Sequence, residues 1–459
     1  MINQAIRGRH TSAVVAALLI LSCSAPSPVA DTPKQPPNFI IIMADDLGYG
    51  DLSTYGGWID VPSIDRFAAE GLKFTDFHSN GAVCSPTRAA LLTGRYQQRA
   101  GIPIVVFADP ERETHRDGLQ PIEYTFSEML KDQGYATGMF GKWHLGYYPH
   151  DNPIHNGFDL FRGYVSGNVD FFSHVDGAGT FDWWHQDEKS DEKGYVTTLI
   201  NQHAVQFIED NKDRPFFLYI PHEAPHYPYQ GPGDGPNGFR VAGKRSVRLE
   251  LSAELTKQKY AEMVVEMDRG VGAVIDAVER LGISERTLIF FFSDNGATPR
   301  GSNGPLRGHK ASVWEGGHRV PGVAWSPGKI RAGSVTDELA AGFDLWPTMA
   351  ELSGNPLPGE RPLDGVSLAP VLLEGKTLGR QVMFWEFEDA VAMRDGSWKY
   401  VAREDGFQGP GLFNLADDLG EQTNLADKFP DRTKSMAETV ANWLQDVGSS
   451  ATGQPSTRK

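Results

Sequence analysis

The segment Asn38-Phe39-Ile40-Ile41-Ile42-Met43-Ala44 is a continuous apolar run that ends in Asp45-Asp46. Such a run is typical of a strand that is buried on both faces of a sheet. A second run, Thr287-Leu288-Ile289-Phe290-Phe291-Phe292-Ser293, ends in Asp294-Asn295-Gly296. The two runs therefore predict buried strands that are each followed by carboxylate or amide side chains.

Two further apolar segments also end in polar clusters. Pro215-Phe216-Phe217-Leu218-Tyr219-Ile220 leads into Pro221-His222-Glu223-Ala224-Pro225-His226, and Ala136-Thr137-Gly138-Met139-Phe140-Gly141 leads into Lys142-Trp143-His144. Helical patterns separate the strands, at roughly 62–71, 125–133, 196–211 and 253–281. This alternation predicts an α/β fold with a large, mainly parallel sheet covered by helices on both faces. Because ligands bind beyond the carboxyl ends of such strands, we expect the four clusters to share one pocket.

After about residue 345 the pattern changes to shorter alternating runs, at 381–387, 390–393 and 398–401, followed by a helix near 431–446. Alternation with a period of two is typical of strands with one buried face. We therefore predict a catalytic α/β domain over residues 38–345 and a smaller C-terminal α+β subdomain with an antiparallel sheet over 346–459.

The N-terminus has the pattern of an export signal over residues 1–23, with basic residues before the apolar run 13–21. That run is too short for an ordinary membrane-spanning helix. Ile20-Leu21-Ser22-Cys23 is similar to a bacterial lipoprotein cleavage box, and ordinary cleavage near residue 25 or 30 is the alternative. Residues 24–37, rich in Pro, Ser and Thr, predict a tether. We expect an exported protein, either periplasmic, secreted or lipid-anchored at the bacterial envelope, whose only membrane contact is that anchor.

The charge of the chain limits its partners. The formal net charge is −16 at pH 7, and loss of Arg7 and Arg9 with the leader makes the mature protein still more acidic. Nucleic acid is therefore excluded as a partner, and an anionic substrate would need a local positive pocket. The two cysteines are Cys23 and Cys84, and either outcome consumes Cys23, by lipidation of its thiol or by removal with the leader. We therefore expect no disulfide, and Cys84 is left for another role.

The polar residues after the first pair of strands suit a cation. Asp45, Asp46, Asp294 and Asn295 offer only oxygen atoms, the ligand type of Ca²⁺ or Mg²⁺. Carboxylates gathered at strand ends would repel one another without a cation. A single strand-end Asp is more often a helix cap or turn residue. Two such pairs on two buried strands favour the metal site.

Cys84-Ser85-Pro86-Thr87-Arg88 precedes the apolar stretch Ala89-Ala90-Leu91-Leu92. A proline can occupy the first turn of a helix, because its fixed φ suits that turn and its missing N–H is not needed there. Cys84 then lies at a helix N-terminus, where backbone N–H groups and the helix dipole favour an anionic or oxyanion-forming group. With Arg88 one turn along, this position suits a nucleophile.

This pentapeptide, with its Leu92-Thr93-Gly94-Arg95 extension, resembles the signature of the type I sulfatases, the family of arylsulfatases and carbohydrate sulfatases. In that family Cys-x-Pro-x-Arg directs oxidation of the cysteine to Cα-formylglycine, whose hydrated aldehyde attacks sulfur. The resemblance runs from Pro37 through the C-terminal region. It implies the alkaline phosphatase-like fold, sulfate ester hydrolysis, and a formylglycine-generating enzyme as a maturation partner.

The resemblance also implies roles for individual residues. The cation, Ca²⁺ or alternatively Mg²⁺, would be bound by the formylglycine oxygen from Cys84 together with the four strand-end residues Asp45, Asp46, Asp294 and Asn295. Lys142, in Gly141-Lys142-Trp143-His144-Leu145-Gly146, would hold formylglycine and sulfate, and His144 would take a proton from the covalent hemiacetal sulfate. Arg88 would secure the diol by charge-assisted hydrogen bonds.

Other motif positions match contacts to the sulfate. His226 matches the sulfate-binding histidine that also protonates the leaving oxygen, and Lys310 matches the second sulfate-contacting lysine. Ser166, in Gly163-Tyr164-Val165-Ser166-Gly167, loosely matches a sulfate-binding serine. His222 and His309 flank these motifs and are either pocket neighbours or packing residues.

The substrate is predicted less directly. The aromatic residues of segment 171–186 form either a sugar-stacking wall or the core of a packed loop. Because an exported enzyme of this kind meets sulfated glycans, we expect a sulfated carbohydrate, a glycan or oligosaccharide. The alternatives are a small-molecule arylsulfatase, a phosphomonoester or phosphonate hydrolase of the same fold, and a non-catalytic binder of sulfated glycan with Cys84 unmodified.

Overall fold

The computed structural model describes residues 35–235, 239–246, 251–355, 361–404, 406–407 and 409–451. The predicted export signal over 1–23, Cys23, and the tether up to residue 34 lie outside the described residues. No helix within the described ranges combines the length and the apolar character that crossing a membrane requires.

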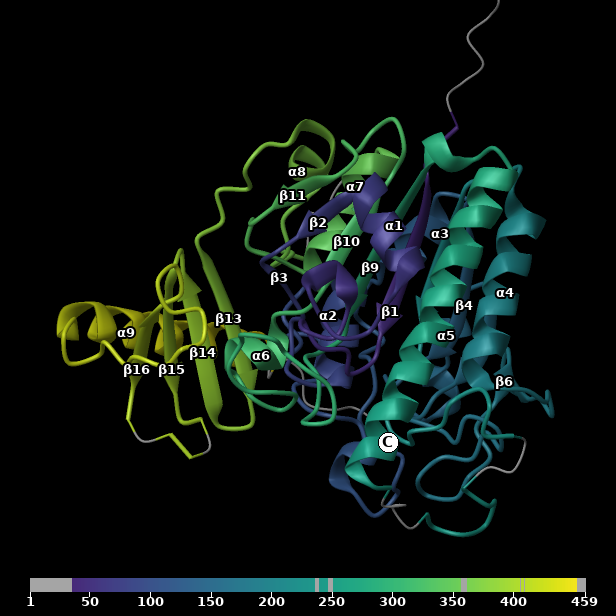
Figure 1. Cartoon of the computed structure of the whole chain (residues 1–459), viewed down its shortest axis with the longest axis horizontal. Coiled ribbons are helices and arrows are strands. Elements are labelled where there is room, and N and C mark those ends of the chain that lie inside the picture. The colour runs from purple at the N-terminus through teal and green to yellow at the C-terminus, as the bar shows by residue number, and fades with distance from the viewer. Residues whose placement is uncertain are drawn as a thin grey trace, which may run out of the picture. The chain divides into compact units, whose positions relative to one another are not determined.

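A ten-stranded sheet forms the centre of the described chain (Figure 1). In spatial order its strands are β11 (Ser334–Thr336), β2 (Leu72–Phe74), β10 (Gly322–Trp325), β9 (Thr287–Ser293), β1 (Asn38–Ala44), β8 (Phe216–Pro221), β4 (Ala136–Lys142), β5 (Leu160–Tyr164), β6 (Trp184–His185) and β7 (Glu188–Lys189). The neighbouring strands from β9 to β5 are all parallel, whereas β10, β6 and β7 pair in antiparallel fashion. The predicted mainly parallel sheet is confirmed.

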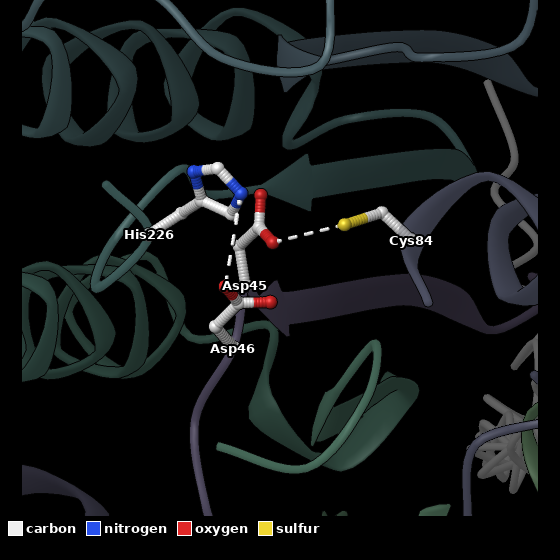
Figure 2. A group of neighbouring side chains, drawn as sticks. All are labelled: Asp45, Asp46, Cys84 and His226. Atoms are coloured by element: carbon white, nitrogen blue, oxygen red, sulfur yellow. Dashed lines mark hydrogen bonds and ion pairs between the residues drawn. The ribbon is translucent and has the colours of Figure 1, made fainter. Parts of the chain in front are cut away.

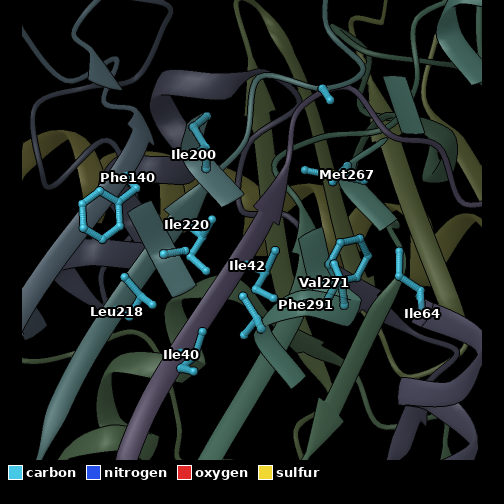
Figure 3. Close-up of a cluster of buried hydrophobic side chains, with 14 of the residues drawn as sticks. Ile40, Ile42, Ile64, Phe140, Ile200, Leu218, Ile220, Met267, Val271 and Phe291 are labelled. Carbon is cyan, nitrogen blue, oxygen red and sulfur yellow. The ribbon is translucent and has the colours of Figure 1, made fainter. Parts of the chain in front are cut away.

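The central strand β1 is buried on both faces because successive side chains point to opposite sides of the sheet. Ile40 and Ile42 belong to one buried hydrophobic cluster, and Phe39 and Ile41 belong to the other. Figure 3 shows the first cluster, where Ile40 and Ile42 of β1 lie among side chains of β8 and β9, such as Ile220 and Phe291, and helix residues such as Val271 belong to the same cluster. The continuous apolar run thus fills two cores at once.

Helices cover both faces, as predicted. The first core includes residues of α1 (Pro62–Glu70), α4 (Val196–Asn211) and α5 (Ala253–Arg280). The second includes residues of α2 (Cys84–Thr93), α3 (Phe126–Asp132), α7 (Leu345–Ser353) and α8 (Ala369–Glu374). The short helices are α6 (Glu315–His318) and the 3₁₀ turns η1 (Ser53–Tyr55), η2 (Glu113–Arg116), η3 (Pro149–Asp151), η4 (Pro153–His155), η5 (Ser284–Arg286) and η6 (Gly342–Asp344).

A separate antiparallel sheet contains β13 (Val382–Phe387), β14 (Ala390–Asp395), β15 (Trp398–Ala402) and β16 (Gly411–Asn414), and α9 (Pro430–Ala451) packs against it. This confirms the predicted smaller sheet with a final helix. A further pair, β3 (Phe77–His78) and β12 (Ala340–Ala341), is parallel. α7 and α8 follow residue 345 but pack in the second core of the large sheet, and the four-stranded sheet begins only at Val382. The predicted domain boundary at residue 345 stays a prediction.

The four strands that the sequence singled out lie next to one another, in the order β9, β1, β8 and β4. Since these strands are parallel, their carboxyl ends meet at one edge of the sheet. The residues that follow them therefore converge on one region, although they are separated by up to about 250 positions in the chain.

Candidate active site

The ends of β1 and β9 bring the two polar pairs together. Asp45 and Asp46 follow β1, Asp294 and Asn295 follow β9, and all four are buried. Asn295 Nδ2 donates a hydrogen bond to Asp46 Oδ1 at 2.7 Å, and the Asp46 backbone N–H donates to Asp294 Oδ1 at 3.3 Å. Asp46 has a φ of +67°, in the left-handed region that Asp enters more readily than most residues. The predicted convergence of these residues is thus present in the fold.

Cys84 occupies the first turn of α2 and faces these carboxylates (Figure 2). Its Sγ lies 3.4 Å from Asp45 Oδ1 and 3.3 Å from Lys310 Nζ. Burial raises the pKa of the thiol to about 12, and the charges of Asp294 and Asp45 act in the same direction. An unmodified thiol at this position therefore stays protonated at neutral pH.

Two lysines neutralise the aspartate pair. Lys142, the last residue of β4, places Nζ 2.5 Å from Asp45 Oδ2, and Lys310 places Nζ 2.5 Å from Asp46 Oδ1. Burial would lower the pKa of each ammonium, but the adjacent carboxylates and Cys84 raise both pKa values above the usual range. Burial likewise favours protonation of Asp46, yet Lys310 and His226 hold its pKa at about 2. Asp46, Lys142 and Lys310 are therefore charged at neutral pH.

Arg88, one turn into α2, is fully buried behind the nucleophile position. Its Nη2 donates to Asp294 Oδ2 at 2.7 Å and lies 3.6 Å from Asp45 Oδ2, while Nη1 donates to the Lys142 carbonyl at 3.0 Å. Arg88 thus joins the ends of β1, β4 and β9 to the helix that carries Cys84.

Two histidines face the same region with defined tautomers, because a carbonyl can only accept a hydrogen bond. His144 Nε2 donates to the Val106 carbonyl at 2.8 Å, so the lone pair is on the buried Nδ1, for which the described part of the chain supplies no hydrogen-bond partner. His226 Nδ1 donates to the Tyr227 carbonyl at 2.6 Å, and its Nε2 lies 3.7 Å from Asp46 Oδ2 (Figure 2). Burial lowers the pKa of both imidazoles, to about 3 in His226.

A cavity of about 340 Å³ opens directly onto these groups, and Cys84, His144, His226 and Lys310 line it. Its remaining wall comes from residues that sequence reasoning missed: Val105, Val106, Phe107, Ala108, Asp109, Tyr147, Gly167, Asn168, Gly177, Ala178 and Arg245. Tyr147 directly follows the motif of Lys142 and His144, which is a usable signal. The other wall residues lie in loops without a recognisable pattern.

The three remaining predicted contacts are not brought to this cavity. Ser166 is buried, and its Oγ donates to the Asn168 carbonyl at 3.1 Å. His222 is buried at the end of β8, where its backbone N–H bonds the Met43 carbonyl at 2.9 Å. His309 is exposed, and its Nδ1 donates to the Lys310 carbonyl at 2.8 Å. None of the three lines the described cavity, and side-chain bonds to nearby carbonyls orient Ser166 and His309 elsewhere.

Segment 171–186 was expected to be either a sugar-stacking wall or a packed loop core, and it is packed. Phe171 and Trp183 are fully buried in the first hydrophobic core. Trp184, on β6, is covered by Lys189, whose Nζ lies 3.6 Å from the ring centroid. Only Gly177 and Ala178 of this segment line the described cavity.

The donor set at the strand ends fits a hard cation. Donor atoms of Asp45, Asp46, Cys84 and His226 all lie within 4.8 Å of one another. Asn295 Oδ1 is buried and has no hydrogen-bond partner among the described residues, so an oxygen ligand is left over at this position. Carboxylate and amide oxygens are the ligands that Ca²⁺ and Mg²⁺ prefer. The residues present therefore suit such an ion.

Comparison with known proteins assigns the chain to a family. A family model described as Sulfatase matches residues 37–355. The chain belongs to the sulfatase family. It is 34% identical over 409 residues to N-acetylgalactosamine-6-sulfatase of Rattus norvegicus, covering 84% of this chain and 74% of that protein. It is 35% identical over 465 residues to Arylsulfatase A of Bos taurus, covering 88% of this chain and 86% of that protein.

Solved structures agree with this assignment. The crystal structure of Ps i-CgsB in complex with k-i-k-neocarrahexaose superposes with a TM-score of 0.78 at 29% identity, covering 89% of this chain and 93% of that chain. This sulfatase is therefore a sulfuric ester hydrolase with the alkaline phosphatase-like fold, as the resemblance of the Cys84 motif implied.

Proposed function

We propose that this sulfatase releases inorganic sulfate from sulfated carbohydrate by means of Cα-formylglycine formed from Cys84. The observation that carries the proposal is the position of Cys84, which contacts both Asp45 and Lys310 at the floor of the cavity. Residues from β1, β4, β9, α2 and the loop of Lys310 meet there. No single segment of the chain could supply this combination of charges.

Asp45, Asp46, Asp294 and Asn295 would hold Ca²⁺, or Mg²⁺ in its place, which when bound supplies charge stabilisation for a sulfate oxygen and for the oxygen at residue 84. Oxidation and hydration of Cys84 supply the hydroxyl that attacks sulfur. Arg88 keeps Asp294 and the helix of Cys84 in register with β4. The chain's own contribution is therefore to hold the attacking group and the anionic substrate in one place.

The sulfate needs positive partners, and Lys142 and Lys310 provide them beside residue 84. Of these two lysines, only Lys310 lines the described cavity, so its ammonium can reach the leaving oxygen. His226 also lines this cavity, but its Nδ1–H is donated to the Tyr227 carbonyl, so it can give a proton only from a protonated Nε2. One of them gives the proton that the departing alcohol requires.

His144 acts in the second half of the reaction. Its Nε2 is committed to the Val106 carbonyl, which leaves Nδ1 as the atom that accepts a proton from the remaining hydroxyl of residue 84. Removal of that proton releases sulfate and restores the aldehyde. Serine at position 84 has no second hydroxyl and would remain sulfated.

Similarity to proteins named for carbohydrate chemistry supports a sulfated sugar as the substrate. The rat relative is an N-acetylgalactosamine-6-sulfatase, and the Ps i-CgsB structure is a complex with neocarrahexaose. The cavity volume of about 340 Å³ is close to the lower limit of typical ligand pockets, roughly 300–1,000 Å³, which suits one sulfated ring.

Maturation and location complete the proposal. A formylglycine-generating enzyme would act on the segment Cys84-Ser85-Pro86-Thr87-Arg88. The leader pattern supports export of the protein, which would then be periplasmic, secreted into the medium or attached to the envelope by a lipid anchor.

Two measurements test this function. The intact mass of the purified protein, localised to the peptide with residue 84, should show loss of sulfur and gain of oxygen. A panel of defined sulfated oligosaccharides, with matched aryl sulfates and phosphate esters, should release sulfate fastest from a carbohydrate. An unmodified Cys84, or faster turnover of the phosphate esters, contradicts the proposal.

A further inference from the structure

An exposed aromatic ring forms part of the outer wall of the catalytic cavity. Phe107 exposes 41% of its surface and lines the cavity together with Tyr147. Most large apolar side chains of this chain are buried, so an exposed phenyl ring that faces the reaction site needs an explanation.

The loop that carries Phe107 is fixed to the catalytic residues. The Val106 N–H donates to Ser85 Oγ at 3.2 Å, next to Cys84 in the chain. The Val106 carbonyl accepts hydrogen bonds from His144 Nε2 at 2.8 Å and from the Tyr147 hydroxyl at 3.2 Å. The position of the neighbouring Phe107 is thus set relative to the nucleophile, as a substrate-binding group requires.

Other contacts stiffen the same wall. The Phe107 carbonyl accepts a hydrogen bond from His115 Nδ1 at 2.9 Å, and the His115 ring stacks on Tyr147 with centroids 5.0 Å apart and planes 14° apart. The guanidinium of Arg112 lies 5.2 Å from the centroid of Phe107. Two aromatic side chains are therefore held in place around the mouth of the cavity.

Charged groups border the aromatic rings. Asp109 lines the cavity and forms an ion pair with Arg245, which also lines it. Arg245 Nη1 lies 3.3 Å from Glu111 Oε2, and the arginine side chain is 63% exposed. A pyranose ring combines a face of C–H groups with a rim of hydroxyls, so it matches an aromatic face beside exposed hydrogen-bonding groups.

We propose that Phe107 and Tyr147, together with the Asp109–Arg245 pair, form a subsite for the sugar next to the one that bears the scissile sulfate. This inference rests on the proposed function, because it takes a sulfated oligosaccharide as the substrate. The sulfated ring occupies the inner cavity near Lys310, and its neutral neighbour packs against Phe107. Longer substrates therefore bind more tightly than a sulfated monosaccharide.

Binding to a protein that cannot turn over tests the subsite. In a Cys84→Ala background, which has no nucleophile at this position, calorimetry compares N-acetylgalactosamine 6-sulfate with a tetrasaccharide that carries this sugar at its end. Phe107→Leu should lower the affinity ratio of tetrasaccharide to monosaccharide roughly fivefold, as expected for loss of apolar contact area. Phe107→Tyr, which keeps the ring, should retain the ratio. Phe429→Leu changes a similarly exposed phenylalanine that does not line the described cavity, and it should not alter the ratio.

Two results would overturn the subsite: a wild-type-like ratio in Phe107→Leu, or no advantage of the tetrasaccharide with Phe107 intact. Failure of the proposed function is seen separately, because it shows as unmodified Cys84 or absent sulfate release in the wild-type protein. The affinity ratio of tetrasaccharide to monosaccharide tests the subsite whether or not the wild-type protein releases sulfate.

Discussion

Two buried charge clusters in this molecule resemble each other in composition but differ in whether their ligand atoms have hydrogen-bond partners. The active-site cluster joins Asp45, Asp46 and Asp294 to Arg88, Lys142 and Lys310. The junction cluster, between the large sheet and the four-stranded sheet, joins Asp76, Glu315 and Glu421 to Arg319, Arg394 and Lys399 and includes His78 and His318. Each contains a group of side chains close enough to share an ion.

The two clusters differ in the hydrogen-bond partners of their ligand atoms. At the junction, Nδ1 of His78 lies 2.9 Å from Nδ1 of His318, and the Nε2 atoms bond Asp76 and the Val313 carbonyl. In the active-site cluster, Asn295 Oδ1 has no partner among the described residues. Both clusters border a cavity, since Lys310 lines one and Asp76, Arg319 and Arg394 line the other. Buried charge beside a cavity therefore does not by itself mark a reaction site, whereas an unpartnered ligand atom within the cluster does.

The largest expected effect lies in the active-site cluster. Cys84→Ser removes the group that can become an aldehyde, so sulfate release should fall by about 10³-fold or more. The melting temperature should change little, because serine is similar in size to cysteine. Sulfate release and circular dichroism melting check both statements. A variant with wild-type turnover would show that Cys84 is not the source of the nucleophile.

The next effect concerns stability at the junction. Lys399 is fully buried and lies 3.0 Å from both Glu315 Oε1 and Glu421 Oε1. Lys399→Met therefore leaves the buried Glu421 without its paired lysine, while Glu315 keeps Arg319 and Arg394. Unfolding free energy should drop by about 3–5 kcal/mol. The matched control is Lys434→Met, which removes an exposed lysine on α9 and should cost under about 0.5 kcal/mol. Urea unfolding measures both, and equal losses would remove the distinction between buried and exposed pairs.

A third test asks which cluster accepts a cation. After chelation, Ca²⁺ at about 100 times its dissociation constant should add about 2.7 kcal/mol to the unfolding free energy. Asn295→Leu should reduce this gain, because it removes the unpartnered oxygen. Asn414→Leu, on β16, should keep it. If the Ca²⁺-dependent gain in unfolding free energy survives in Asn295→Leu but is lost in variants of the junction cluster, the ion binds at the junction cluster and the predicted site is wrong.

The smallest expected effect is on pH dependence at the junction. Burial raises the pKa of Glu421 to about 7, with Glu315 acting in the same direction and Lys399 opposing it. Since this folded-state pKa exceeds the unfolded value, the resulting stability is present at low pH and is lost as pH rises toward 7. The loss should be on the order of 2 kcal/mol between pH 4.5 and 7. Denaturation at several pH values should show a flatter profile in Glu421→Gln, and an unchanged profile would assign the effect elsewhere.

The sequence predicted those strands of the fold whose continuous apolar runs indicate burial on both faces. The apolar runs of β1 and β9 are buried on both faces, and their polar ends lie where parallel strands place ligands. The short strands β2 and β10, of three and four residues, carry too little periodicity to be recognised. Their pairing depends on long-range contacts that no local pattern encodes.

The candidate site shows the same limit. Cys84, at the start of α2, meets Lys310 and His226 as expected, although these two lie in the loops that follow β9 and β8. His309 was chosen because it adjoins Lys310, but adjacency does not fix the direction of a side chain. Phe107 was missed because a loop residue carries no periodic signal, although the exposure of its ring is evident once the chain is folded.

The shared core at the junction has a consequence for the order of synthesis. Ala90, on the helix that begins at Cys84, belongs to the same hydrophobic cluster as Met383, Trp385 and Trp443. A ribosome must therefore add some 350 further residues before that helix can receive its final neighbours. Cys84 is 2% exposed in the finished fold, so the maturation enzyme of the proposed function would have to reach its sulfur during this interval. Under the proposed function, the late arrival of the last sheet would set a time window for the conversion of Cys84.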